Sequence, residues 1–192
     1  MLLYALQRFS LDDWGHNTEF KPVSDEKNVR HKITISDDRL GFVDLELHTG
    51  DDDKDQVKNY GLKGRATNVF DVTSDRLAKE FPHAQKDGMV AKIFWGEQQR
   101  HSEPEILQKV SEIAAQKESV KGHVPDLLWS HKFVEPTSEV REQLGIPEPT
   151  KGSRVLYILV FRKLQPITKL HGKRFFDVWK QCILCTWSVV ST

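Results

Sequence analysis

Apolar and polar positions alternate in several short segments, which is typical of half-buried β-strands. Segments 31–35 and 41–48 are predicted to be strands, and the second alternates with Val43, Leu45 and Leu47 on one face. The polar turn SDDRLG between them predicts a β-hairpin. Residues 89–95, MVAKIFW, form an apolar strand that contains one lysine, Lys92. The run 154–161, RVLYILVF, does not alternate, so we expect a strand that is covered on both faces.

The other segments have weaker patterns. Residues 57–73 predict a strand, a tight turn on Gly61 and Gly64, and a second strand. Residues 124–135 predict a further strand. Residues 1–30 lack clear periodicity, 74–88 are expected to form a polar connector, and 136–152 an exposed connection.

Helical spacing of apolar residues begins after Ser102. Ser102 and Glu105 form a capping box, which predicts a helix over 102–116 with Glu103 in its first turn. A second helix is predicted over 175–187. Together with the strands, these helices indicate an α+β fold with an antiparallel sheet of about five strands. The apolar stripe of the first helix consists of Ile106, Leu107, Val110, Ile113 and Ala114.

Composition narrows the classes of partner. Lys plus Arg equals Asp plus Glu at 28 each, so no overall field attracts nucleic acid or an anionic membrane. No apolar run approaches the roughly 20 residues that cross a bilayer, and we expect an intracellular protein, cytoplasmic or nuclear. Cys182 and Cys185 are interpreted as packing residues of the second helix, because no further zinc ligands lie near them in the sequence.

The acidic run 51–55, DDDKD, resembles the start of a calcium-binding loop. Such a loop requires glycine at its sixth position and glutamate at its twelfth, where this chain has Gln56 and Leu62. We therefore interpret the run as a solvated turn and predict no metal site.

Lys92 is the candidate with the clearest chemistry. An ammonium in an apolar strand loses hydration unless its stem reaches water or an anion pairs with it. Glu103, at the start of the following helix, is the candidate anion. Both alternatives stay open at this point: Lys92 could extend to solvent at a sheet edge, and Glu103 could be an ordinary first-turn acid.

Three features follow one another in the order found in protein kinases: a glycine-bearing hairpin, a strand lysine and a glutamate on a helix. The segments GLKGRATNVFDV, MVAKIFW and SEPEILQKV resemble the first lobe of the fungal-type protein kinase domain. The resemblance covers roughly residues 57–187. It implies a kinase-like N-lobe over 57–164, an N-terminal extension over 1–56, and a hinge exit with truncated first C-lobe helices over 165–192.

The resemblance also implies a nucleotide site for ATP with Mg²⁺. Lys92 would contact the α and β phosphates, Glu103 would hold Lys92, and Val69 would cover the adenine. Gly64 would be the central glycine of the phosphate loop. The third glycine is replaced by Thr67 and the first by Leu62, which implies a looser grip. The hinge backbone expected at the adenine edge consists of Phe161, Arg162, Lys163 and Leu164.

The catalytic motifs of the family, H-R-D-x-x-x-x-N and D-F-G, do not occur in the 192 residues. The family transfers the γ-phosphoryl group of ATP to Ser or Thr, and this chain alone is expected to be inactive. Two alternatives remain. One is a non-catalytic pseudokinase-like module that binds a nucleotide or a protein partner, and the other is a lobe like that of small-molecule phosphotransferases.

Overall fold

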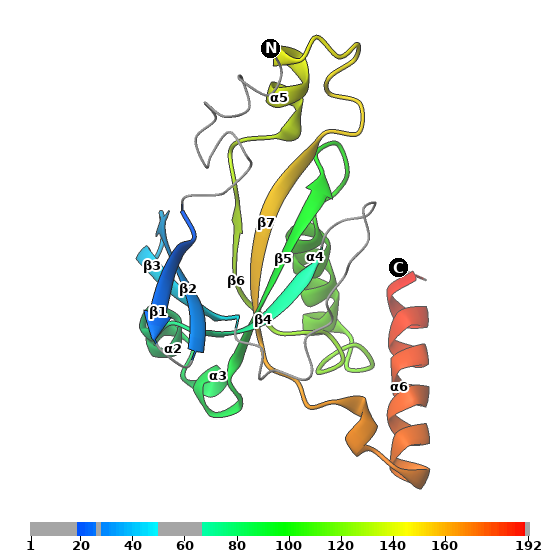
Figure 1. The fold of residues 1–192 in the computed structure, drawn as a ribbon. Helices are drawn as coiled ribbons and strands as arrows, with labels where there is room; N and C mark the ends of the chain where they lie inside the picture. Colours follow the sequence, from blue (N-terminus) through cyan, green and yellow to red (C-terminus); the bar gives the residue numbers. More distant parts are fainter. Residues whose placement is uncertain (1–18, 26–27, 50–66, 191–192) are drawn as a thin grey trace.

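The computed structural model describes residues 19–25, 28–49 and 67–190 (Figure 1). Within these residues the chain forms one antiparallel sheet of seven strands in the order β1-β2-β3-β4-β5-β7-β6, with helices packed against it, so the fold is α+β. The strands are β1 (Lys21–Asp25), β2 (Asn28–Asp37), β3 (Gly41–His48), β4 (Asn68–Thr73), β5 (Met89–Glu97), β6 (Leu127–Lys132) and β7 (Arg154–Arg162).

The seven strands of the described residues exceed the expected number of about five. The predicted hairpin is confirmed as β2 and β3, and it joins the later strands because β3 pairs with β4 through Leu47 and Val72. The sequence pattern does not predict β1, because Pro22 and the polar residues around it hide any alternation. The prediction for β7 is confirmed: residues 155–160 are all buried in this strand, which lies between β5 and β6.

The helices are α2 (Asp75–Glu80), α3 (Pro82–Asp87), α4 (Glu103–Gln116), α5 (Thr137–Gln143) and α6 (Gly172–Val190), with a 3₁₀ turn, η1, at Ile167–Lys169. The prediction of a polar connector over 74–88 is wrong, because these residues form α2 and α3. Ser74 caps α2 by accepting a hydrogen bond from the Leu77 amide at 3.3 Å, and Leu77 is fully buried. A third helix, α5, lies within the predicted exposed connection.

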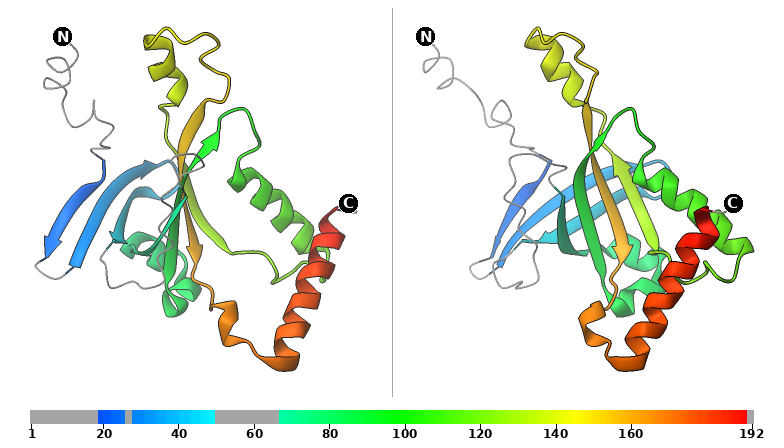
Figure 2. Two further views of the ribbon diagram at one scale, coloured as in Figure 1. Left: turned by 45° about the vertical axis from the view of Figure 1, so that its right-hand side comes forward. Right: turned by 90° about the vertical axis from the view of Figure 1, so that its right-hand side faces the viewer.

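The sheet is strongly curved, so that its first strands face its last ones. In Figure 2, β1 to β3 cross the direction of β5 to β7, and α2 and α3 lie at one end of the space between the two halves. The main core fills this space. Its buried residues come from the hairpin, α2, and the last strands, for example Ile33, Leu45, Leu77, Trp129 and Ile158.

Two contacts join the two ends of the sheet: one between β6 and the end of β2, and one between the residues just before β1 and just after β6. The indole Nε1 of Trp129 donates to Asp37 Oδ2 at 2.8 Å, and the rings of Phe20 and Phe133 lie 6.5 Å apart. Burial opposes ionisation of Asp37, but hydrogen bonds from the Leu40 amide and the Trp129 indole outweigh it and lower the pKa of the carboxyl. His131 stacks on Trp129, and its pKa is lowered by burial.

The opposite face of β5 and β7 carries a second, smaller core under α4. Phe94 and Tyr157 stack there with ring centroids 5.4 Å apart, and Leu107 of α4 packs against them. Gly96 is required beside this stack, because a Cβ at that position would lie 2.9 Å from Tyr157 Cε2. This face is the one that carries Lys92.

Helix α6 follows the sheet and is reached through η1 (Figure 1). Its Cys185 is buried, and Gln181 lies 3.3 Å from His123 Nε2, so this side of the helix faces the rest of the molecule. Phe176 and Trp179 are more than half exposed on another side. Among the described residues, no helix combines the length and the apolar character needed to span a membrane.

Candidate functional site

Lys92 and Glu103 form a direct ion pair. The Lys92 ammonium lies 2.7 Å from Glu103 Oε1 and 2.6 Å from Oε2, so it contacts both carboxylate oxygens. The two side chains remain 28% and 31% exposed, which means that the pair is partly open to solvent rather than deeply buried. The pairing predicted from the sequence is therefore confirmed, and the alternative of a lysine extended freely into water is excluded.

Strand β5 and its two neighbouring strands fix the position of the Lys92 backbone. Lys92 is in the middle of β5, opposite Val69 of β4 and Leu159 of β7. Its ammonium also lies 5.1 Å from the centre of the ring of Phe94, a residue of the second core. A cation at the face of an aromatic ring is attracted to the ring's π-electrons, so the apolar surface around Lys92 helps to hold the side chain in place.

The start of α4 positions Glu103. Glu103 is the first residue of the helix, and the expected capping box is present: the Glu105 amide donates to Ser102 Oγ, and the Ser102 amide donates to Glu105 Oε2 at 3.1 Å. The hydrogen bond from the Ser102 amide lowers the pKa of Glu105. One stripe residue differs from the expectation, because Ile106 is 49% exposed whereas Leu107 packs on the second core.

Apolar side chains lie on the same sheet face beside Lys92. Val90 is two positions before Lys92 on β5, pairs with Asp71 and Phe161, and therefore points to the same side as Lys92. Val69 is 49% exposed on this side. Val69, Val90 and Phe161 thus form an apolar strip that continues from the ion pair along the strands.

The segment expected to be the hinge is at the end of β7. Arg162 donates its amide to the Asp126 carbonyl at 3.1 Å, and Lys163 donates its amide to the Gly88 carbonyl at 2.9 Å. These two amides are therefore already hydrogen-bonded, to the residues that immediately precede β6 and β5. A ligand that accepts a hydrogen bond from the backbone of this segment would have to accept it from the amide of a later residue, such as Leu164. The expected contacts of Phe161 to Leu164 with adenine stay a prediction.

Sequence reasoning missed the partner of Lys163. The Lys163 ammonium lies 2.6 Å from Asp71 Oδ2, and the two residues border a depression of about 390 Å³ with His48 and Gly88. Asp71 and Lys163 are 92 positions apart in the chain, so no local spacing could have joined them. The pairing follows only from the placement of β5 between β4 and β7.

The remaining predicted site residues have different outcomes. Thr67 is described and precedes β4, but Gly64 and the acidic run 51–55 lie outside the described residues. Among the described residues, no group of three His, Cys, Asp or Glu side chains is arranged to hold a metal ion. Near Lys92 the carboxylate of Glu103 already binds the ammonium, so Mg²⁺ would have to arrive with the phosphates of a nucleotide.

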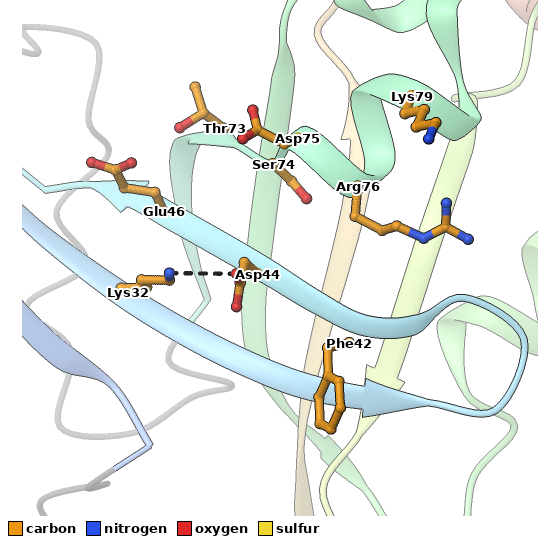
Figure 3. A pocket seen from close by; sticks show the side chains of 9 residues that line it. All are labelled: Lys32, Phe42, Asp44, Glu46, Thr73, Ser74, Asp75, Arg76 and Lys79. Carbon is orange, nitrogen blue, oxygen red and sulfur yellow. Dashed lines mark ion pairs between the residues drawn. The ribbon is translucent and has the colours of Figure 1, made fainter.

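A second concavity, of about 410 Å³, lies between the outer face of the β2–β3 hairpin and the start of α2 (Figure 3). Several of the charged side chains that line it form ion pairs or hydrogen bonds within the protein. Lys32 pairs with Asp44 at 3.4 Å, and the Arg76 guanidinium donates to the Leu40 carbonyl at 2.8 Å. These contacts account for the charged side chains as part of the fold, so this concavity is a weaker candidate than the Lys92 face.

Comparison of the chain with known protein families, with curated proteins and with solved structures finds no match.

Proposed function

We propose that the sheet and α4 form a nucleotide-binding lobe of the protein-kinase type. In this proposal, ATP with Mg²⁺ binds to the face of the sheet that carries Lys92. The observation behind this proposal is the ion pair between a strand lysine and a glutamate at the start of the next helix. In protein kinases this arrangement holds the lysine against the nucleotide phosphates. The resemblance to the fungal-type protein kinase domain supports the same assignment.

The surroundings of the pair fit such a ligand. Lys92 is partly exposed, so phosphate oxygens can reach its ammonium while Glu103 keeps it oriented. The adjacent strip of Val69, Val90 and Phe161 offers the apolar contact that a flat base needs. Phosphoryl transfer is proposed only for a protein that also contains the H-R-D and D-F-G segments, because these supply the acceptor-orienting aspartate and the metal ligands.

The test is a thermal shift measurement on the complete chain with and without Mg·ATP. At a ligand concentration of about 100 times Kd, binding stabilises the folded state by roughly 2.7 kcal/mol. For a chain of this size, each kcal/mol raises Tm by about 2–4 °C, so a shift of about 5–10 °C is expected. Lys92→Ala and Glu103→Ala should each reduce this shift severalfold.

Matched controls come from the same helix. Lys109→Ala and Glu112→Ala change the same residue types at exposed positions of α4 and should leave the nucleotide shift unchanged. No shift in the unmodified chain would reject nucleotide binding by this lobe. A shift that survives both site substitutions would place the nucleotide elsewhere on the molecule.

A further inference from the structure

The Asp71–Lys163 pair borders the part of the apolar strip that leads away from Lys92: Asp71 is opposite Val90, two positions from Lys92, and Lys163 lies farther along. Lys92 is opposite Leu159 of β7, and the chain runs on from Leu159 to Lys163. At about 3.4 Å per residue, the backbone separation from Lys92 along the strands is roughly 14 Å for Lys163 and roughly 7 Å for Asp71. A nucleotide whose phosphates contact Lys92 and whose base lies on the strip would therefore bring the edge of the base toward the pair.

The pair is built across three strands. Asp71 is on β4, Lys163 follows β7, and the stem of Lys163 passes over Gly88 at the start of β5, where a Cβ would lie 3.7 Å from Lys163 Cδ. Both charged groups remain substantially exposed, at 45% for Lys163 and 35% for Asp71. Ion pairs with this exposure contribute little to stability, so the pair is available for ligand contacts without great cost to the fold.

The pair offers one hydrogen-bond acceptor and one donor side by side, which suits the polar edge of a purine base. An ionised carboxylate only accepts hydrogen bonds and an ammonium only donates them. Adenine carries an amine donor at position 6, where guanine carries a carbonyl acceptor, and the adjacent ring nitrogen N1 accepts in adenine and donates in guanine. A fixed acceptor beside a fixed donor therefore complements one of these purines better than the other in a given orientation.

We propose that Asp71 and Lys163 read the edge of the purine base, and that they make the chain discriminate adenine from guanine nucleotides. Asp71 accepts from the exocyclic amine of adenine, and Lys163 donates to the neighbouring ring nitrogen. This inference rests on the nucleotide site proposed above. It goes further by assigning base selectivity to two side chains rather than to the backbone of the hinge.

The experiment compares the Kd values of Mg·ATP and Mg·GTP, measured by titrated thermal shift, for the complete chain and for Asp71→Ala and Lys163→Ala. A well-placed pair of base contacts discriminates by about tenfold or more. We expect the unmodified chain to favour ATP by at least that factor, and each variant to lose most of the preference. Lys32→Ala is the matched control, because Lys32 forms a similarly exposed ion pair on the outer face of the hairpin (Figure 3).

The outcomes separate this inference from the proposed function. Equal affinity for the two nucleotides in the unmodified chain, or a preference that persists in both variants, would overturn the base-reading role and leave the nucleotide site standing. No binding of either nucleotide would overturn both. Loss of affinity for ATP and GTP by the same factor in the variants would show that the pair supports binding without reading the base, which also contradicts the inference.

Discussion

The Lys92–Glu103 pair should have a measurable coupling energy. Lys92→Met removes the charge and keeps most of the stem over Phe94, and Glu103→Gln keeps the shape of the side chain. Fully exposed pairs contribute about 0.2–1 kcal/mol, whereas removing one partner of a buried pair costs about 3–5 kcal/mol. With 28% and 31% exposure, the pair lies between these cases, and we expect a coupling energy of about 1–2 kcal/mol.

The assay is a double-mutant cycle measured by urea denaturation. Glu103→Gln also loses the favourable interaction of the carboxylate with the N-terminus of α4, about 0.3–1 kcal/mol, but this loss occurs in both the single and the double variant and cancels in the cycle. Lys151 and Glu148 form a control pair that is more than two-thirds exposed, and its coupling should be close to zero. A Lys92–Glu103 coupling no larger than that of the control would refute the reasoning.

Three further substitutions test other parts of the fold. Ser102→Ala removes the cap of α4 and should lower the free energy of unfolding by about 1 kcal/mol in urea, with an unchanged m-value; no loss would mean that the capping box does not stabilise the helix. Gly96→Ala forces a methyl group against Tyr157 and should destabilise by about 1–3 kcal/mol, seen as a lower Tm, and an unchanged Tm would contradict the close contact. Because the pKa of Asp37 is lowered in the folded state, its stabilising effect is present above the ordinary aspartate pKa and is lost as pH falls through the lowered value. Asp37→Asn should therefore flatten the loss of stability in urea titrations from pH 6 to pH 3, and an identical acid slope would argue against this role.

Local sequence patterns predicted the elements that are long or strongly patterned. The β2–β3 hairpin has alternating apolar positions, β7 is a continuous apolar run, and α4 begins with a capping box. Each of these signals can be recognised within one segment. The pairing of Lys92 with Glu103 was also predictable, because a short loop joins the strand that ends shortly after Lys92 to the helix that begins at Glu103.

The missed features have physical reasons as well. Helices α2 and α3 have six residues each, too few for a helical repeat to show, and tertiary burial of Leu77 and Ala84 stabilises them. The Asp71–Lys163 pair depends on which strands become neighbours across the sheet. No local pattern encodes that order, so half of the candidate site could be found only in the structure.

The position of β7 between β5 and β6 has a consequence for how the chain acquires its fold. Among the described strands, β6 pairs only with β7, although β7 is synthesised after the other six. The Trp129–Asp37 contact that joins the two ends of the sheet thus waits for a strand synthesised later than both partners. Such a high contact order slows folding, and nascent chains that stop before residue 154 would expose the apolar surface of β5 and β6 to chaperones and to aggregation.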